Sequence, residues 1–417
     1  MEKKKLNKSY AAEALDVWRI AFAGDEEFET DFCMKFFSQD NLWEQSNCWL
    51  DGDKLISTYF SLEVELLVRS KRLTGRYIDG LATLPEYRKK GLITKCMTDD
   101  IISCYQAQAG VDLMLVDPSR DSFYRHVGFE YAVDKYEAVV NVSFFKPSDE
   151  KTSYRIKVDT LAGKPLRKDY EALNKWLWEN SRYNEMKWPA SHEDVKFMRD
   201  DIYVAVTYDK GRNPQGYMLY ELGGDNIYVL SIRFTCFEAL DALRHHVVSM
   251  PNLKYCKFSS IPSDFPLEAI VKEMGRPEEA IILRRSNTRM ARIINFKAIL
   301  EKLIVVWPNT PVMLEIKDSI LPQNNTCFAI LPEGKIQQFD SDKPKPEPDF
   351  ITMSIANAAP LLCGMTSAAE LYYSGRLVVS DCRNVSQSRH RLPEAVKKVD
   401  DMLPKITTFN ADEYLVP

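Results

Sequence analysis

The sequence lacks the residue patterns that usually bind metal ions or form disulfide frameworks. Only five histidines occur in 417 residues, and none is spaced from another histidine or from a cysteine as zinc ligands are. The nine cysteines are an odd number and include no Cys-x-x-Cys pair. Their scatter through apolar stretches is typical of proteins from a reducing compartment. We therefore expect no metal and a cytoplasmic location.

Long apolar runs and an excess of positive charge are also missing. No stretch approaches the length that crosses a bilayer, and the basic beginning MEKKKLNKSY is not followed by the apolar segment of a signal peptide. With 55 basic and 60 acidic residues, the net charge of −5 offers no general attraction for nucleic acid or an anionic membrane. The hydrophobic content of 45% and the length predict a globular protein of two to four domains.

Positive charge is instead concentrated in one turn within residues 81–97, LATLPEYRKKGLITKCM. Arg88, Lys89 and Lys90 precede Gly91, and an amphipathic run follows. The N–H groups of the first turn of a helix form an anion site, and a glycine lets the anion approach the backbone. A solvated basic turn is the alternative, because such a short string is common.

The segments around this turn predict alternating strands and helices, which favours the anion site. We expect a strand over 72–83, with Gly80 at a bulge or a close backbone approach. A helix is expected over 94–107 and a short buried strand over 111–116. The aromatic motif FYRHVGF at 123–129 then predicts a short helix that ends at a glycine. The combination is more specific than any one of its parts.

The pairing of YRKKGL with FYRHVGFE resembles the GNAT N-acetyltransferases, whose Arg-x-x-Gly-x-Gly/Ala loop holds the pyrophosphate of acetyl-CoA. Ile93 occupies the last loop position, as in a subset of that family. The layout of the whole chain is similar to the Eis-type (enhanced intracellular survival) branch. This resemblance implies a hexamer and an α/β (α+β) architecture with three domains. They are a catalytic GNAT domain at 1–147, a degenerate GNAT-like domain at 148–287 and a sterol-carrier-like α+β domain at 288–417, each GNAT sheet being mixed and flanked by helices.

The middle of the chain repeats the strand–helix rhythm of the first third without its basic turn. Phe234-Thr235-Cys236-Phe237 stands where an anion loop should lie, and it has neither a glycine nor a basic triplet. We therefore predict that this copy binds no CoA and is structural. In the last domain, apolar helices are expected near 355–362 and 367–373; they could line a lipid site, but such helices more often form core.

Residue roles follow from the resemblance. Tyr124 is expected to be the general acid, because a phenol with a pKa of about 10 can pass a proton to a CoA thiolate of comparable basicity. The alternative is a tyrosine that only packs its helix. We read Cys96 and Cys104 as core and not as nucleophiles. The expected acetyl-CoA contacts are Leu81, Ala82 and Thr83 for the pantetheine arm, Arg88, Lys89, Lys90, Gly91, Leu92, Ile93 and Thr94 for the pyrophosphate, and Ser119 and Arg120 on the far side.

The base and the acceptor site are less defined by the sequence. In the Eis-type family the terminal carboxylate reaches the active site, which would be that of Pro417 here. Its intrinsic pKa of about 3.5 makes it a weak base that orients the ammonium or a relay water. The acidic residues Asp25 and Glu26 are either part of a solvated loop or one wall of a site for a cationic substrate.

We therefore predict an acetyl-CoA-dependent N-acetyltransferase that acts on a primary amine of a polycationic small molecule, such as an aminoglycoside or a polyamine. The acetyl group would pass directly to the amine in a ternary complex. Protein or peptide lysines are alternative acceptors. A different class of function also stays open, namely a non-enzymatic lipid-binding or scaffold protein that uses its sterol-carrier-like domain.

Overall fold

The computed structural model describes residues 1–22, 37–38, 40–107, 110–146, 154–187, 201–272, 281–339, 350–380 and 392–408. Three predicted site residues, Asp25, Glu26 and Pro417, lie outside the described residues. Within these ranges, no helix is long and apolar enough to cross a membrane.

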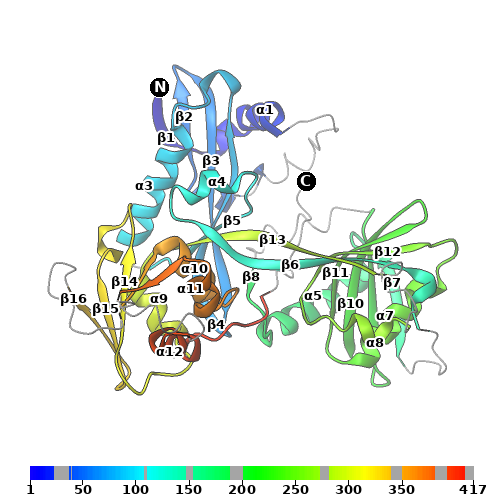
Figure 1. The fold of residues 1–417 in the computed structure, drawn as a ribbon. Helices are drawn as coiled ribbons and strands as arrows, with labels where there is room; N and C mark the ends of the chain where they lie inside the picture. The colour runs from blue at the N-terminus through cyan, green and yellow to red at the C-terminus, as the bar shows by residue number, and fades with distance from the viewer. Residues whose placement is uncertain are drawn as a thin grey trace. The chain divides into compact units, whose positions relative to one another are not determined.

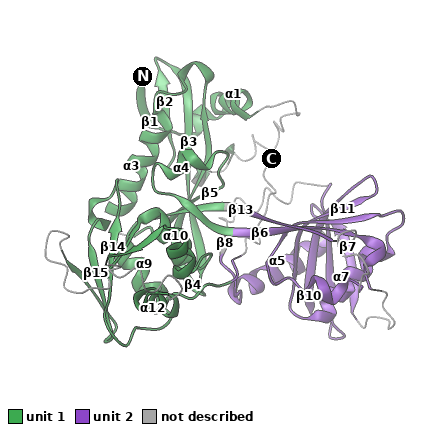
Figure 2. Cartoon of the chain, in the orientation of Figure 1, with its two compact units in different colours: residues 1–133, 288–406 green, residues 134–287, 407–417 purple. Residues whose placement is uncertain are grey.

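Contacts divide the chain into two compact units, which Figure 2 colours separately. Unit 1 comprises residues 1–133 and 288–406, and unit 2 comprises residues 134–287 and 407–417. The three-domain division proposed from the sequence is finer than this one and stays a prediction.

The N-terminal part of unit 1 is a mixed sheet with helices on both faces (Figure 1). Its strand order is β1-β2-β3-β4-β5-β13, and neighbours are antiparallel except for the parallel pair β4 and β5. The elements are β1 (Glu2–Lys5), α1 (Ala11–Phe22), β2 (Asn47–Asp51), β3 (Lys54–Val68), β4 (Lys71–Thr83), α3 (Leu92–Gln106), β5 (Leu113–Val116), α4 (Asp121–Arg125) and β13 (Ile281–Ile293).

The alternation of side chains along β3 shows that α1 and α3 cover opposite faces of this sheet. Thr58 accepts a hydrogen bond from the Trp18 indole of α1 at 3.1 Å, while its neighbour Tyr59 donates to Asp100 of α3 at 2.9 Å. Adjacent strand residues point to opposite faces. Asp100 is buried, and its charge is compensated by Arg76 of β4 at 2.8 Å. Such a pair fixes the position of α3 because either charge alone would be costly to bury.

Most of the strands and helices predicted around the basic turn are confirmed, with small shifts at their ends. The predicted strand 72–83 corresponds to β4, the helix 94–107 to α3 and the strand 111–116 to β5. Strand β1 was not predicted; its residues Glu2–Lys5 read EKKK and are largely exposed. A short, charged edge strand has no apolar pattern to detect.

Unit 2 repeats the order of elements found in the N-terminal part of unit 1. Its sheet runs β6-β12-β11-β10-β9-β7, with β11 and β12 parallel and the other neighbours antiparallel. The elements are β6 (Glu130–Asn141), β7 (Arg155–Thr160), α5 (Lys164–Glu179), β8 (Glu185–Lys187), β9 (Tyr203–Tyr208), β10 (Pro214–Gly223), β11 (Asn226–Phe234), α7 (Phe237–Ser249), β12 (Tyr255–Ile261) and α8 (Leu267–Ile270).

The last strand of each sheet is supplied by the other half of the sequence. In unit 1, β5 pairs with the Met290–Ile293 end of β13, which follows the second copy in the chain. In unit 2, β12 pairs with residues Tyr136–Asn141 of β6, which follow the first copy. β13 begins at Ile281, so only its last residues pair with β5.

The C-terminal part of unit 1 is a smaller sheet of order β16-β15-β14-β17-β18. Its apolar helix α10 is almost entirely buried, as expected for core. The elements are α9 (Phe296–Leu303), β14 (Val312–Lys317), β15 (Cys327–Leu331), β16 (Lys335–Phe339), β17 (Phe350–Ser354), α10 (Ile355–Cys363), α11 (Ala368–Tyr373), β18 (Leu377–Val379) and α12 (Glu394–Met402).

Candidate active site

A bulge in β4 breaks the sheet of unit 1 at the centre of the candidate site. Thr58 pairs with Ala82 and Phe60 with Asp79, so one residue of β3 faces the two residues Gly80 and Leu81. Gly80 has φ +55, and a Cβ there would lie 2.1 Å from the Trp18 ring. Conformation and space therefore both require glycine. The bulge expected at Gly80 is confirmed.

Beyond the bulge, β4 separates from β5. The register of this parallel pair ends at Ile78 opposite Val116, while β4 itself continues to Thr83. The backbone of Leu81, Ala82 and Thr83 thus runs past the end of β5. A strand that has left its neighbour can pair with an extended ligand by the same backbone hydrogen bonds.

The basic turn that follows β4 has the backbone of an anion site. Lys89 and Gly91 have φ of 63° and 73°, and Gly91 is the N-cap of α3. Left-handed residues in a turn direct successive N–H groups to one side, and the helix start adds further donors. Arg88 donates to the Thr83 carbonyl at 3.1 Å, which ties the turn to the end of β4. Lys90 lies 4.5 Å from the Tyr87 ring centroid.

Replacing Gly91 by alanine is expected to raise the Kd of acetyl-CoA about tenfold with little change in kcat. Alanine in the left-handed region costs roughly 1 kcal/mol, and its methyl group would occupy open space at the turn where we expect the anion. No atom lies within 4 Å of the Cβ position, so the folded chain tolerates the substitution sterically. Equilibrium binding measured by calorimetry tests this.

Gly375 provides a matched control for that substitution. Its φ of +72 is nearly that of Gly91 and its Cβ position is equally open, but it lies between α11 and β18. Gly375→Ala should therefore strain the backbone similarly without affecting acetyl-CoA. An equal loss of affinity in the two variants would remove the turn at Gly91 from the site.

Tyr124 lies on α4, the short helix after β5, with its side chain buried. Burial raises the pKa of its phenol to about 12, although a hydrogen bond with Ser119 opposes the shift and the charges of Asp79 and Asp117 add to it. Tyr124 is thus near Ser119, which the sequence had placed on the far side of the site. The phenol stays protonated at neutral pH, so it can act as a hydrogen-bond donor or general acid but not as a base.

Asp79 is a candidate functional residue that sequence reasoning missed. It is the last β4 residue before the bulge, and it accepts the Gly80 N–H at 2.7 Å. Burial raises the pKa of its carboxyl to about 6, with a smaller contribution from the charge of Asp117. A carboxylate with a pKa near the working pH is suited to general base catalysis.

Asp117 is held in an ion pair and is therefore less available for chemistry. The Arg289 guanidinium of β13 donates to its two oxygens at 2.7 and 2.9 Å, and Tyr77 donates to it at 3.1 Å. Arg289 lies on β13, the strand supplied by the other half of the sequence. The site therefore includes a residue far from the two motifs that predicted it, YRKKGL and FYRHVGF.

The turn after α4 is supported by a buried arginine of the same strand. Arg292 donates from Nε to the Val127 carbonyl at 3.0 Å and pairs with Asp318 at 2.7 Å. Gly128 has φ +85, and a Cβ there would lie 2.8 Å from Arg292 Nε. The glycine that ends the FYRHVG motif is thus required by its conformation and by this arginine.

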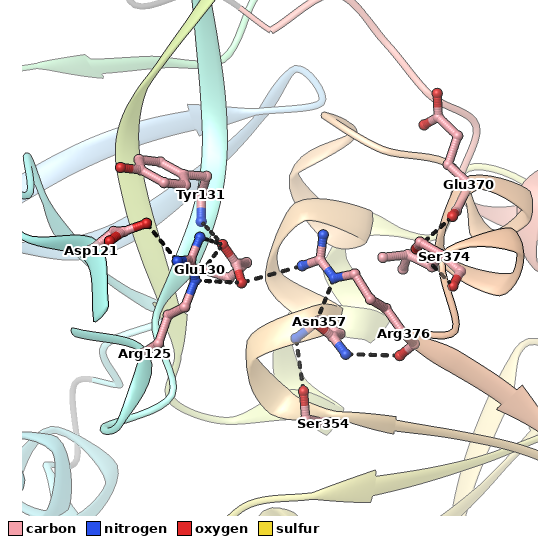
Figure 3. A network of polar contacts seen from close by, with 10 residues as sticks. Asp121, Arg125, Glu130, Tyr131, Ser354, Asn357, Glu370, Ser374 and Arg376 are labelled. Carbon is pink, nitrogen blue, oxygen red and sulfur yellow. Dashed lines mark hydrogen bonds and ion pairs between the residues drawn. The ribbon is translucent and has the colours of Figure 1, made fainter. Parts of the chain in front are cut away.

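A polar network also joins α4 to the C-terminal part of unit 1 (Figure 3). Arg125, next to Tyr124, contacts Asp121 at 2.5 Å and Glu130 at 3.0 Å. Glu130 forms an ion pair with Arg376 at 3.4 Å, and Arg376 donates to Asn357 at 3.0 Å. Hydrogen bonding to Glu130 raises the pKa of Arg125. These contacts therefore connect α4, the helix that carries Tyr124, to the C-terminal part of unit 1.

The two cysteines on α3 lie in the core. Cys96 and Cys104 are buried, and burial raises their pKa values to about 11 and about 12. Both stay thiols at neutral pH, which agrees with their interpretation as core. In the part of the chain that the structure describes, no group of three His, Cys, Asp or Glu side chains could hold a metal ion.

The structure thus places most of the predicted site residues on connected elements of unit 1. The turn residues, Ser119, Arg120 and Tyr124 follow the carboxyl ends of the neighbouring parallel strands β4 and β5, where they meet at one edge of the sheet. The positions of Asp25, Glu26 and Pro417 lie outside the described residues, so their roles stay predictions.

Comparisons with known proteins agree with this geometry. Residues 2–132 match a family model described as an acetyltransferase (GNAT) domain, and residues 296–407 match one described as a sterol carrier protein domain. No curated protein matches the sequence.

Solved structures resemble the chain over nearly its whole length. A probable N-acyltransferase from Enterococcus faecalis V583 has 19% identity and a TM-score of 0.80, with 99% of each chain covered. Eis1 from Mycobacterium abscessus has 18% identity and a TM-score of 0.76, with 99% of this chain and 100% of that chain covered. A GCN5-related N-acetyltransferase from Anabaena variabilis ATCC 29413 has 15% identity and a TM-score of 0.77, at the same coverage.

These identities establish a shared fold, and the family models assign its first and last parts. The predicted architecture of tandem GNAT domains followed by a sterol-carrier-like domain is confirmed. The protein is an N-acetyltransferase with a GNAT acetyltransferase domain at residues 2–132 and a sterol carrier protein domain at residues 296–407.

Proposed function

We propose that the protein is an Eis-type enzyme that transfers the acetyl group of acetyl-CoA to a primary amine of a polycationic small molecule. The observation that supports this most is the bulge at Gly80, which leads β4 away from β5 beside Tyr124 and into the turn at Arg88–Gly91. This arrangement provides backbone for the pantetheine arm, donors for the pyrophosphate and a phenol for the departing sulfur. GNAT domains use acetyl-CoA as their co-substrate, and these residues fit that molecule.

The proposed reaction is a direct transfer in a ternary complex. The neutral amine attacks the thioester carbonyl, a C–N bond forms and the C–S bond breaks. Donors directed at the developing charge lower the barrier for such a step. Tyr124 donates to the leaving sulfur, and the amine loses its proton to Asp79, directly or through water. The terminal carboxylate of Pro417 is a second proposed base.

A cationic acceptor is supported by the charges near Tyr124. The charges of Asp79 and Asp117 both raise the pKa of the phenol, and because Asp117 is already paired with Arg289, Asp79 is the carboxylate proposed to meet a cationic ligand. Carboxylates at a site attract cationic ligands and orient an ammonium group. Lysine side chains in peptides remain the second candidate acceptor, because they offer the same ammonium group.

A panel of amines tests the proposed acceptor class. Spermine, kanamycin, a lysine peptide and a neutral monoamine would be incubated with acetyl-CoA, and acetylated products would be identified by mass spectrometry. We expect acetylation of the polycationic small molecules at the highest kcat/KM. Acetylation of the lysine peptide alone would contradict the proposed substrate, and no acetylated amine would contradict the proposed function.

The pH dependence of kcat/KM is expected to show the ionisation of Asp79. Below about pH 6 the Asp79 carboxyl is protonated and cannot accept a proton, so activity should rise as the pH increases through about 6. Asp79→Asn should lower kcat/KM at least about 100-fold and remove this limb. The acceptor amine also ionises, and its effect on the pH profile of kcat/KM appears in both proteins. The difference between the two profiles therefore reports the ionisation of Asp79.

Extending the C-terminus by two glycines separates the two proposed bases. If Pro417 supplies the base, the extended protein loses activity, while Asp79→Asn keeps the pH profile of the wild type. If Asp79 supplies it, the extension leaves the limb in place. An unchanged profile in Asp79→Asn would exclude Asp79 from proton transfer.

The remaining proposals concern assembly and location. By resemblance we propose a homohexamer in the cytoplasm, which native mass spectrometry and cell fractionation test. A lipid-binding role of the sterol-carrier-like domain is tested separately by mass spectrometry of co-purified lipid.

A further inference from the structure

Unit 2 contains a cavity of about 580 Å³ that the proposed function does not use. It lies between the end of α5, the junction of β11 with α7, and the loop after β12. Its volume is within the range of sites for small organic ligands. Its apolar lining residues are Trp176, Leu177, Ile232, Phe234, Phe237 and Phe265.

The cavity occupies the position in unit 2 that corresponds to the candidate active site in unit 1. Both sites lie where a pair of parallel strands ends and a helix begins, at β11, β12 and α7 in unit 2 and at β4, β5 and α3 in unit 1. The equivalent strand is also bulged. Leu219 pairs with Ser231 and Tyr220 with Val229, so β11 has one extra residue at Leu230.

The connection between strand and helix is too short to form an anion loop like that of unit 1. Only Thr235 and Cys236 separate β11 from α7, whereas eight residues, 84–91, separate β4 from α3. No glycine or basic triplet lies there. The second copy therefore keeps the ligand-sized space but lacks the anion loop.

The side chains at the cavity favour a flat aromatic ligand. Trp176 and Phe237 are 50% and 49% exposed although they are large and apolar, which leaves ring surface available for stacking. Phe234 and Phe265 pack edge-to-face at 5.9 Å and form part of the wall. An aromatic ligand that stacks on these rings would remove apolar surface from water.

The polar edge of the cavity carries charges of both signs. Arg182 pairs with Asp264 at 2.7 Å, and Asp264 also accepts the Tyr183 hydroxyl at 3.0 Å. Arg182 in turn donates to that hydroxyl at 2.9 Å. A second arginine, Arg233, is buried in the wall. The edge therefore offers hydrogen-bond donors and acceptors to a polar substituent.

We propose that this cavity is a second small-molecule site for a planar aromatic compound that stacks on Trp176 and Phe237. The compound contacts the Arg182–Asp264 pair with a polar substituent. The site is separate from the acetyl-CoA site of unit 1 and belongs to the copy whose anion loop is missing.

N-phenyl-1-naphthylamine is a suitable probe because it is neutral and aromatic and becomes fluorescent in apolar surroundings. Titrated against the full-length protein, it should bind saturably, and Trp176→Ala should weaken its binding at least about tenfold through the loss of a stacking partner. Tyr255→Ala is the matched control, since Tyr255 is an exposed aromatic of unit 2 that does not line the cavity. Saturating acetyl-CoA should leave the probe bound.

Cys236 gives a second readout at the same place. It lines the cavity and is half-buried, and trypsin releases it as the one cysteine of peptide 234–244. The probe should slow its alkylation by N-ethylmaleimide in the wild type and not in Trp176→Ala. Absence of saturable binding, equal affinity of wild type and Trp176→Ala, displacement by acetyl-CoA, or unprotected Cys236 would each overturn the proposal.

Discussion

Replacing Tyr124 by phenylalanine is expected to lower kcat about 100- to 1000-fold and to leave the Kd of acetyl-CoA within about twofold. The substitution retains the ring, which packs edge-to-face with Phe123 at 5.1 Å and Phe129 at 6.2 Å. It removes only the hydroxyl that donates to the departing sulfur. Loss of one donor aimed at a developing charge typically costs this much in rate.

The raised pKa of Tyr124 changes the role that we expect for its hydroxyl. At a pKa of about 12 the phenol is a weaker acid than the sequence suggested, so complete transfer of its proton to a thiolate is less favourable. We therefore expect stabilisation of the leaving sulfur by a hydrogen bond to be its main contribution, with the proton supplied finally by solvent.

Steady-state kinetics with acetyl-CoA binding measured by calorimetry tests this prediction. Tyr59→Phe is the control, because it also removes a buried tyrosine hydroxyl, one that donates to Asp100 at 2.9 Å on the α3 side of β3. Its kcat should remain near that of the wild type. A wild-type kcat in Tyr124→Phe would remove the phenol from the mechanism.

Replacing Asp318 by alanine is expected to destabilise the protein by about 3–5 kcal/mol. Asp318 is 6% exposed and pairs with Arg292, which has no measurable exposure. It also accepts hydrogen bonds from the backbone of Ile320 and Leu321 and from Asn324. Its removal leaves a buried guanidinium without its countercharge, the costliest way of breaking an ion pair.

Urea unfolding followed by circular dichroism measures this loss. Glu301→Ala removes an exposed partner of Lys297, 3.9 Å away on α9, and should change stability by less than about 1 kcal/mol. Arg292→Met combined with Asp318→Leu should recover much of the stability lost in Asp318→Ala, because neither charge is then buried alone. A loss in Asp318→Ala no larger than that of the surface control would contradict the structural role of the pair.

The local parts of the site could be predicted because each depends on residues close in the sequence. Gly80 is fixed by the φ of the bulge and by Trp18, and Gly91 by the φ of the N-cap of α3. Each of these requirements is visible in the sequence as a glycine, and the periodicity of the neighbouring strand and helix shows where their ends lie. Helix α3 and strands β4 and β5 follow from their apolar patterns.

The missing parts depend on contacts between distant residues. Arg289 and Arg292 lie about 170 residues after α4, and nothing near them indicates that they reach Asp117 and the Val127 carbonyl. The exchange of β6 and β13 creates these contacts. A strand that pairs with the sheet of the other copy has the same apolar periodicity as a strand that pairs with the sheet of its own copy. Sequence patterns therefore cannot distinguish the two pairings.

Asp79 illustrates a third limit. A single aspartate inside a strand has no motif, and its raised pKa arises from burial and from Asp117, 38 positions later. Only the folded environment separates it from the other acidic residues of the chain. The same holds for Arg376, whose ion pair with Glu130 connects two parts of unit 1.

A crystal structure of the protein with acetyl-CoA measures the location of the site most directly. We expect the pyrophosphate against the backbone N–H groups of Lys89–Thr94, the pantetheine arm along Leu81–Thr83, and the thioester sulfur within hydrogen-bond distance of the Tyr124 hydroxyl. Acetyl-CoA bound at the β11–α7 junction of unit 2, or a thioester distant from Tyr124, would contradict the assignment of this site.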